Sequence, residues 1–476
     1  MILEDRGAIQ AAPAWGRATL DGILRKCARE HADRLALVDD PDRESWNSTP
    51  PQELTYAELD RRVDALAGFF RMAGLQQDSI IALDAPPTSD TVIILLAAMR
   101  AGLIAFPVPS LWTRRDCMTV LSPLGPKAVI VTSVSKGESR AERLRDVADT
   151  IRSTKLVFGY GGGLPGGVMD LAGSLRADDM LPAPPVDREG EPAEHIATIT
   201  ANGAPAASTR LHARAHRHWI ASGLSFVLEA KLRDGASYLL PFSLSGLTGI
   251  GAGIVPWLLT SGTLNLHRFD RLTQLAARAQ EIDPDAIILP GPLSEPLHAA
   301  GLWSEDDEPT IGVVWKDSHP DPSREIDAGR RVIDITAIDD LAFVARRREG
   351  SGVVPLPVGP VNVPSDSAGG SAILEIRIEG HLHKASDSRA SLLGGLLSLR
   401  GMAVPTARSI PGDNETPAAT GIEPSAEGFV RTDIEGRLAD GAIRGVLPAG
   451  RHDRENGVAT PEDSTWPERP GRRAAI

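Results

Sequence analysis

The sequence predicts an α/β fold with mostly parallel sheets, followed by a β-rich region. Short apolar strands alternate with helices between residues 35 and 158, an order typical of parallel sheets covered by helices. The uncharged stretch 235–266 contains two prolines and many glycines, so it predicts a buried strand, loop and helix and no membrane span. From residue 356 the chain is rich in Val, Ile, Gly and Pro, with alternating strands at 373–378 and 396–400, which indicates a β-rich region.

The composition is that of a soluble protein without nucleic-acid or membrane partners. The 476 residues, 42% hydrophobic and 24% charged, suffice for two or three domains. A formal net charge of −13 offers little attraction to nucleic acids or anionic membranes, and the strongest basic run, Arg346–Arg348, is expected to be a solvated helix end. Cys27 and Cys117 lack metal or redox spacing, and residues 1–12 lack the apolar core of a signal peptide, so buried thiols in a cytoplasmic protein are expected.

Local signals predict two helices near the start of the chain. Thr55 and Glu58 form a capping box that starts a helix over Tyr56–Ala73, and Gly74 ends it. The apolar run Thr91–Arg100 predicts a second helix.

Two clusters have the residue types of ligand sites but lack the neighbouring sequence that such sites require. The glycines of 159–167 are not followed directly by an apolar helix, so a flexible loop is favoured over a dinucleotide site. His212, His216 and His218 include the i, i+4 spacing of zinc ligands, but the glutamate of the metalloprotease motif is missing. Solvated helix residues are therefore favoured over a metal site.

The stretch 194–212 runs from an apolar strand into a small-residue turn at Thr200–Gly203, a geometry that cradles phosphates with backbone N–H groups. It resembles the phosphate loop of the adenylate-forming (acyl-CoA synthetase, AMP-binding) superfamily, which reads Ser-Gly-Thr-Thr-Gly-x-Pro-Lys-Gly and is followed by Thr-His. Gly203 falls on the second glycine of that loop, Pro205 on its proline and His212 on its histidine. The two threonines become Ala201 and Asn202, and the lysine becomes Ala206.

Other motifs extend the resemblance over residues 16–453. Leu54–Leu59 matches the family's Leu-Thr-Tyr-x-Glu-Leu, and 95–108 and 426–438 match further scaffold motifs. The resemblance implies an adenylate-forming large domain: two α/β-layered subdomains with mostly parallel sheets and a distorted β-barrel. It divides the chain into an N-terminal arm (1–15), a first α/β subdomain (16–180), a second one with the phosphate loop (190–355), the barrel (356–450) and a disordered tail (451–476).

The same resemblance implies a set of site residues, with ATP or AMP and Mg²⁺ as cofactors. The segment after the strand at 238 resembles the wall of the carboxylic-acid pocket, and Asp340 stands where the family has a magnesium-binding glutamate; the alternative for Asp340 is an exposed helix start. Thr336 replaces the tyrosine that stacks on adenine, and Lys316 begins the segment that replaces the family's Gly-Gly-Ala-Pro turn. The implied residues are Gly203, Asp433 and Arg451 for the nucleotide, Phe242, Ser243 and Leu244 for the acid, and Asp340 for the metal.

These substitutions predict a degenerate acyl-CoA synthetase homologue. The chain has no lysine after Lys384 and too few residues after Arg451 for the family's small C-terminal domain, so no catalytic residue is identified. Such a pseudoenzyme would bind an acyl group, a nucleotide or a protein partner. One alternative is an atypical acyl-AMP-forming ligase acting on a fatty or aromatic acid, and another is a structural interaction subunit with an empty cleft. A homodimer is the default oligomer.

Overall fold

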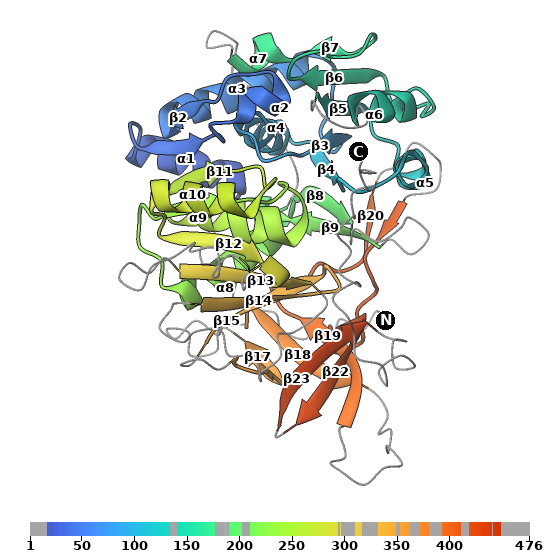
Figure 1. Cartoon of the computed structure of the whole chain (residues 1–476). Coiled ribbons are helices and arrows are strands. Elements are labelled where there is room, and N and C mark those ends of the chain that lie inside the picture. Colours follow the sequence, from blue (N-terminus) through green and yellow to red (C-terminus); the bar gives the residue numbers. More distant parts are fainter. Residues whose placement is uncertain are drawn as a thin grey trace, which may run out of the picture.

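Three β-sheets stacked along one axis organise the chain (Figure 1). The computed structural model describes residues 17–133, 140–176, 186, 190–201, 210–293, 296, 310–316, 332–348, 353–361, 372–379, 393–410, 418–439 and 441–448. Two of the sheets are mostly parallel and the third is antiparallel and barrel-like, so the predicted fold class is confirmed.

The first sheet has seven strands in the order β7-β6-β5-β3-β4-β8-β9. Its neighbours run parallel except for β9, which pairs antiparallel with β8. Its strands are β3 (Ile80–Asp84), β4 (Ile104–Val108), β5 (Ala128–Thr132), β6 (Leu156–Tyr160), β7 (Met169–Asp170), β8 (Ile196–Ala201) and β9 (Leu211–Ala215). The helices of this part of the chain are α1 (Leu20–Glu30), α2 (Arg43–Asn47), α3 (Tyr56–Met72), α4 (Ser89–Arg100), α5 (Arg114–Leu124), α6 (Arg140–Ala148), α7 (Ala172–Arg176) and the 3-10 turn η1 (Pro192–Glu194).

The second sheet has eight strands in the order β15-β14-β13-β12-β10-β11-β1-β2. Its centre is parallel, with the antiparallel strands β15 and β2 at its two edges. Its strands are β1 (Leu35–Val38), β2 (Glu53–Thr55), β10 (Ser237–Leu240), β11 (Thr263–Leu266), β12 (Ala286–Pro290), β13 (Thr310–Lys316), β14 (Val332–Ile338) and β15 (Ala342–Arg347). The associated helices are α8 (His216–Ala230), the π-helix η3 (Leu247–Ile254), α9 (Val255–Leu259), α10 (Leu272–Ile282) and the 3-10 turn η4 (Gly291–Leu293).

The third sheet is antiparallel, with six strands in the order β16-β23-β22-β19-β18-β17. A separate two-stranded hairpin, β20 with β21, leads back toward β9, where the N–H of Gly421 donates to the carbonyl of Leu211 at 2.6 Å. The bounds are β16 (Leu356–Pro357), β17 (Gly359–Val361), β18 (Leu374–Glu379), β19 (Leu393–Arg400), β20 (Arg408–Ile410), β21 (Ala418–Thr420), β22 (Val430–Ala439) and β23 (Ala442–Pro448).

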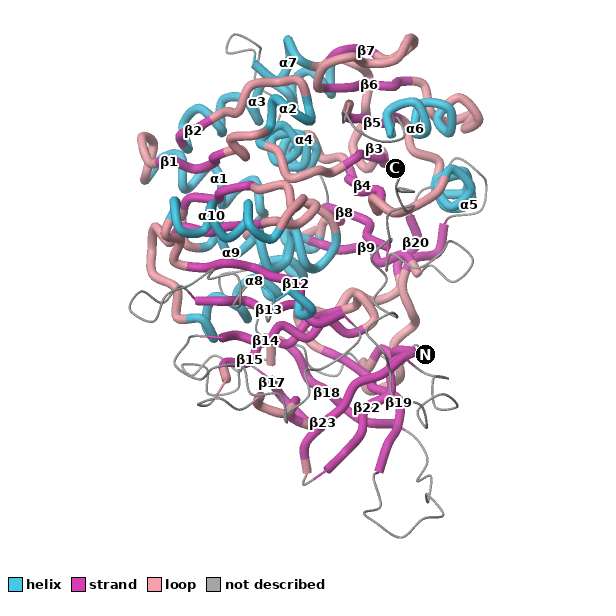
Figure 2. Tube along the Cα trace, in the orientation of Figure 1, coloured by secondary structure: helices cyan, strands magenta, loops and turns pink. Residues whose placement is uncertain are grey.

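Helix α4 lies at the centre of the largest hydrophobic core. All twelve of its residues are buried, because its sequence is apolar on every side and a helix of that kind has no face for water. The same core contains residues of α1, α3 and α9 and of strands from both parallel sheets, so these helices are packed between the two sheets (Figure 2).

Several local predictions are confirmed. Thr55 and Glu58 form the capping box of α3, which ends at Met72 with Ala73 as its C-cap, and Gly74 follows with a positive φ. Cys27 and Cys117 are both buried. Within the residues that the structure describes, no helix is both long enough and apolar enough to cross a bilayer.

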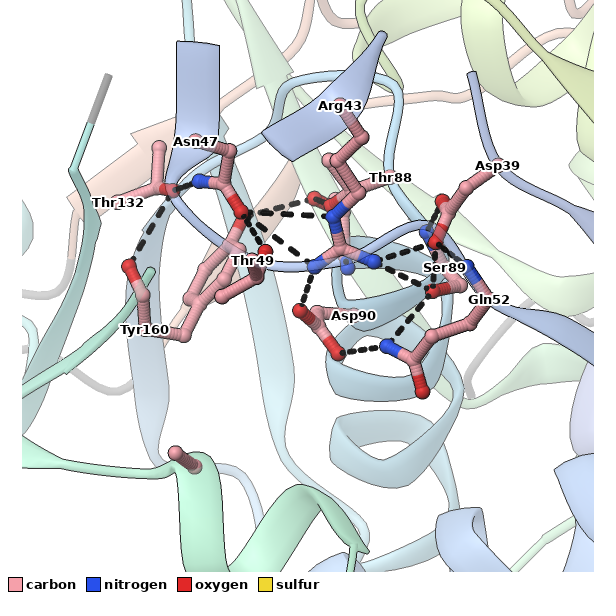
Figure 3. Close-up of polar contacts among 12 residues, drawn as sticks. Asp39, Arg43, Asn47, Thr49, Gln52, Thr88, Ser89, Asp90, Thr132 and Tyr160 are labelled. Carbon is pink, nitrogen blue, oxygen red and sulfur yellow. Dashed lines mark hydrogen bonds and ion pairs between the residues drawn. The ribbon is translucent and has the colours of Figure 1, made fainter. Parts of the chain in front are cut away.

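A buried polar network joins the two parallel sheets near the start of α4 (Figure 3). The guanidinium of Arg43, fully buried in α2, pairs with the carboxylates of Asp39 and Asp90. Ser89, in the first turn of α4, donates its backbone N–H to Asp39 at 2.7 Å. Two carboxylates satisfy one buried cation, and removing any member would leave a charge without its partner in a low dielectric.

The side chain of Asn47 extends this network toward the glycine-rich loop 159–167. Its amide donates to Thr132 at 3.1 Å and to the carbonyl of Ser133 at 2.8 Å. The N–H of Gly162 in turn donates to the carbonyl of Asn47 at 3.0 Å, and a Cβ at this glycine would lie 2.4 Å from that of Ser48. Gly161 and Gly162 therefore permit close packing of this loop on the end of α2.

The prediction for Arg346–Arg348 is wrong. Arg346 and Arg347 end strand β15, and Arg348 follows it. Arg347 donates to the backbone carbonyls of Glu229 and Ala230, and Arg348, only 6% exposed, forms a two-point ion pair with Asp334. Arg347 and Arg348 therefore bond to groups of α8 and β14 that the fold brings beside them.

Candidate functional site

A cavity of about 230 Å³ lies where strands of both parallel sheets end. Strands β4 and β8 of the first sheet and β10, β13 and β14 of the second contribute residues at or just beyond their carboxyl ends. Ligands of open α/β sheets bind at this edge, because the loops that follow the strands converge there. The lining residues are Pro107, Pro109, Ser110, Leu111, Ala201, Phe242, Ser243, Ser245, Gly246, Leu247, Thr248, Lys316, Ala337 and Asp340.

The segment proposed as the acid pocket is anchored to both sheets. Phe242 and Ser243 follow β10 and line the cavity. The hydroxyl of Ser243 donates to the carbonyl of Ala85, just after β3, at 2.7 Å, and the N–H of Leu244 donates to the same carbonyl at 2.9 Å. Leu244 is fully buried and packs in the core beside the cavity. Phe242 and Ser243 thus line the cavity, and Leu244 fixes the turn that carries them.

Asp340, expected as a metal ligand or an exposed helix start, lines the same cavity. It lies with Asp339 in the turn between β14 and β15, where both residues have positive φ values of 47° and 52°. Its carboxylate atom Oδ2 is buried without a hydrogen-bond partner among the described residues. Burial raises the pKa of this carboxyl, although the charges of Arg214 and Lys316 act in the opposite direction. The helix-start alternative is therefore wrong.

Arg214, a residue of β9, holds this turn in place. Its side chain is fully buried and donates to the hydroxyl of Thr200 at 3.0 Å, to the carbonyl of Leu341 at 3.0 Å and to the carbonyl of Asp340. The guanidinium also lies over the ring of Trp219, 5.0 Å from its centroid. Burial lowers the pKa of Arg214 to about 10. Each left-handed residue of the turn costs about 1–3 kcal/mol, so these bonds help to keep the strained turn.

Arg210 links the cleft to the barrel-like sheet. Its guanidinium donates to the carboxylate of Asp339 at 2.8 Å and also pairs with Asp433 of β22. The backbone N–H of Asp433 donates to the same Asp339 carboxylate at 3.2 Å. Asp433, the expected nucleotide-binding carboxylate, is 66% exposed at the cleft and has an internal cation as its partner.

The other expected nucleotide residues, Gly203 and Arg451, lie outside the described residues, as do the arm 1–15 and the tail 451–476. The described residues contain no group of three or more His, Cys, Asp or Glu side chains that could hold a metal ion.

The prediction of solvated histidines is wrong. His212 lies in β9 and His218 in α8, both with no exposed surface, and His216 starts α8 with 4% exposed. The ring of His218 accepts the N–H of Ala215 at 2.9 Å and so caps α8, and His216 accepts the N–H of Leu20 at 3.2 Å. Neighbouring elements bury residues that the local pattern places in solvent.

Sequence reasoning missed Arg210 and Arg214 and gave Lys316 no binding role. A signal existed for Lys316, since it is the charged last residue of an otherwise apolar strand, Thr310–Lys316, and such positions face the ligand edge of a parallel sheet. For the two arginines the sequence offered no signal, because the carboxylate partners of Arg210 and the carbonyl partners of Arg214 lie more than 120 positions away.

We expect replacement of Arg214 to destabilise the fold strongly. Arg214→Met leaves two backbone carbonyls and a hydroxyl without donors in the interior, which costs on the order of 2–4 kcal/mol. The control is Arg233→Met, because Arg233 is 70% exposed and its ion pair with Asp285 contributes about 0–1 kcal/mol. Chemical unfolding at equilibrium measures both, and equal losses would contradict the assigned role.

Acid should destabilise the protein through its buried histidines. Burial, aided by the charges of Arg214 and Arg210, lowers the pKa of His212 to about 3, and burial also lowers the pKa of His218. The unfolded chain takes up protons near pH 6.5 and the native state does not, so this stability is complete above pH 6.5 and is lost as pH falls toward 3.

The expected loss is about 1.4 kcal/mol per histidine between pH 7.5 and 5.5. Chemical unfolding of His212→Asn at both pH values should show a loss smaller by about that amount than the loss of the wild type. An unchanged pH dependence in His212→Asn would refute the assignment.

Comparison with known proteins agrees with this geometry. The family model described as AMP-binding enzyme matches residues 24–290, more than half of the chain. The salicyl-AMP ligase / salicyl-S-ArCP synthetase of Mycobacterium tuberculosis is 30% identical over 212 residues, covering 44% of this chain and 36% of that protein. The medium-chain fatty-acid–CoA ligase of Escherichia coli is 21% identical over 278 residues, covering 58% of this chain and 47% of that protein. The chain thus spans about a third to a half of these relatives.

Solved structures share the fold. The N-terminal subdomain of Klebsiella oxytoca NpsA, in complex with 3-hydroxybenzoyl-AMSN, superposes with a TM-score of 0.62 at 17% identity, covering 91% of this chain and all of that one. A benzoate CoA ligase from Burkholderia xenovorans LB400 gives a TM-score of 0.66 at 15% identity, covering 92% of this chain and 80% of that one. The match of the family model over more than half of the sequence, together with the two-sheet cleft, establishes that this chain belongs to the AMP-binding enzyme family.

Proposed function

We propose that this chain binds a carboxylic acid and an adenine nucleotide in the cleft between its sheets, and that it does not by itself carry out ordinary acyl-adenylate and thioester formation. The observation that carries the proposal is the pairing of Arg210 with both Asp339 and Asp433. By the resemblance, Asp339 stands where the family has a threonine that touches phosphate, and Asp433, proposed for the nucleotide, already pairs with a cation of the protein. Both features weaken the electrostatic stabilisation on which phosphoryl chemistry depends.

The loop sequence supports the same proposal. Relative to the family loop, Ala206 replaces the lysine, and Ala201 and Asn202 replace the threonines. Loss of one preorganised charged group of this kind costs about 3–4 kcal/mol of barrier, or 10²–10³ in rate. Gly203 and Arg451 remain proposed nucleotide-binding residues.

Asp340 remains the proposed ligand for Mg²⁺. Its orphaned buried oxygen suits a hard cation, and Mg²⁺ commonly takes one or two protein carboxylates and completes its shell with phosphates and water. When bound, the ion would neutralise phosphate charge. Phe242 and Ser243 would contact the acid, and Leu244 would hold their turn.

An atypical acyl-AMP-forming ligase is the second candidate. The presence of Asp340 and Lys316 in one cavity favours it, because the cavity then has both a carboxylate for a metal ion and a cation for an anionic substrate. The curated relatives are ligases by name, one for salicylate and one for medium-chain fatty acids.

Thermal unfolding with and without millimolar AMP and Mg²⁺ tests nucleotide binding. A ligand at about 100 times its Kd stabilises the native state by about 2.7 kcal/mol, so we expect the midpoint to rise by a few degrees. GMP serves as the control nucleotide, and Asp433→Ala should reduce the shift. No shift with AMP or with any acid would contradict the proposal and favour a structural subunit.

Trapping with hydroxylamine tests the absence of ligation. We expect no acyl-hydroxamate above background when the chain is incubated with ATP, Mg²⁺ and a panel of aromatic and fatty acids. Product formation at an ordinary enzymatic rate would contradict the pseudoenzyme proposal and establish the ligase candidate.

A further inference from the structure

Among its described lining residues, the cavity contains one positive and one negative side chain. Lys316 lies at the end of β13, and Asp340 lies in the turn after β14, the neighbouring strand. The two interact electrostatically, since the lysine favours the charged form of the carboxyl. Hydroxyl groups of Ser110, Ser243, Ser245 and Thr248 complete the polar part of the lining.

The walls limit the size of a ligand. The volume of about 230 Å³ is below the roughly 300–1,000 Å³ of sites for drug-sized molecules. Behind the cavity, η3 packs directly on β10 and the turn that follows it. A Cβ at Gly249 would lie 2.0 Å from the carbonyl oxygen of Ser243, and one at Gly253 would lie 2.5 Å from the side chain of Leu240. These close contacts leave no room for one added methyl group between η3 and β10 at Gly249 or Gly253.

Lys316 and Asp340 differ in exposure and in hydrogen bonding. Lys316 is exposed, so a ligand carboxylate can approach its ammonium group without an initial cost of burying the lysine. Asp340 is 9% exposed and its Oδ2 has no partner among the described residues. A buried acceptor without a donor is unfavourable, so a ligand that brings an N–H or O–H to this oxygen gains affinity.

We propose that Lys316 binds the carboxylate of a small acid, with one ring or a short chain, and that Asp340 favours acids that also carry an amino or hydroxyl group. This inference rests on the proposed function, since it assumes that the cleft receives an acid. Dicarboxylates and long fatty acids are excluded, the first by repulsion from Asp340 and the second by the packed wall. Lys316 then sets which acid enters without a contribution from a metal ion. The Oδ2 atom of Asp340 that receives the donor of the acid is the one proposed above for Mg²⁺, so the ion and that donor compete for it.

Calorimetric titration of the whole chain tests the role of Lys316. The probes are benzoate, hydroxybenzoate, aminobenzoate and octanoate, with benzamide as the uncharged isostere, each in EDTA and again in Mg²⁺. Lys316→Gln should weaken benzoate binding about 10- to 100-fold and leave benzamide within about twofold, because a charge-assisted bond is lost. Lys316→Arg should retain most of the affinity. Lys26→Gln is the matched control, since Lys26 is 63% exposed on α1.

The Asp340→Asn variant tests the second half of the proposal. We expect the wild type to bind aminobenzoate and hydroxybenzoate more tightly than benzoate, and the variant to lose most of this preference. The inference is overturned if Lys316→Gln binds benzoate as the wild type does, if octanoate binds more tightly than benzoate, or if binding requires Mg²⁺. If the wild type binds no acid while AMP still raises its unfolding midpoint, only this inference fails; loss of both responses would refute the proposed function too.

Discussion

The geometry of the cleft depends on one buried cation, Arg214. Its guanidinium extends from β9, at the edge of the first sheet, to the turn between β14 and β15 in the second, and so links the two sheets directly. A fully buried arginine is costly unless its donors are satisfied, and here two backbone carbonyls and a hydroxyl accept them. The turn that it holds is the one that places Asp340 at the cavity. The hydrogen bonds of Arg214 therefore both stabilise the fold and position the candidate site.

Carboxylates at and near the cavity are compensated by cations of the protein itself. Three carboxylates lie close together: Asp339 and Asp433 share the guanidinium of Arg210, and Asp340 follows Asp339 and lines the cavity. Arg210 compensates two of them from within the protein, and Lys316 lies beside the third. Such internal compensation stabilises the folded chain. The proposal that the chain binds ligands without transferring a phosphoryl group rests on this arrangement.

Sequence patterns predicted features whose signals lie within one element. They missed contacts between elements that are distant in the sequence. The capping box at Thr55 and the apolar helix α4 were predictable because their signals lie within one element. In β9, by contrast, His212 and Arg214 alternate with apolar and small residues, a pattern typical of one solvated face. Both are buried, because the turn after β14 covers that face. The order of elements along the chain likewise does not show that β1 and β2 join the second sheet, or that β8 and β9 join the first.

The most direct test of the central claim is a crystal structure of the chain with AMP and a hydroxybenzoate at saturating concentrations. The account predicts the acid in the cavity beside Phe242 and Ser243, with its carboxylate at Lys316 and its hydroxyl group directed at Asp340. It also predicts AMP at Asp433, with no covalent bond between the two ligands after incubation with ATP in place of AMP. An acid bound elsewhere, an empty cavity, or an acyl-adenylate formed in the crystal would contradict the account.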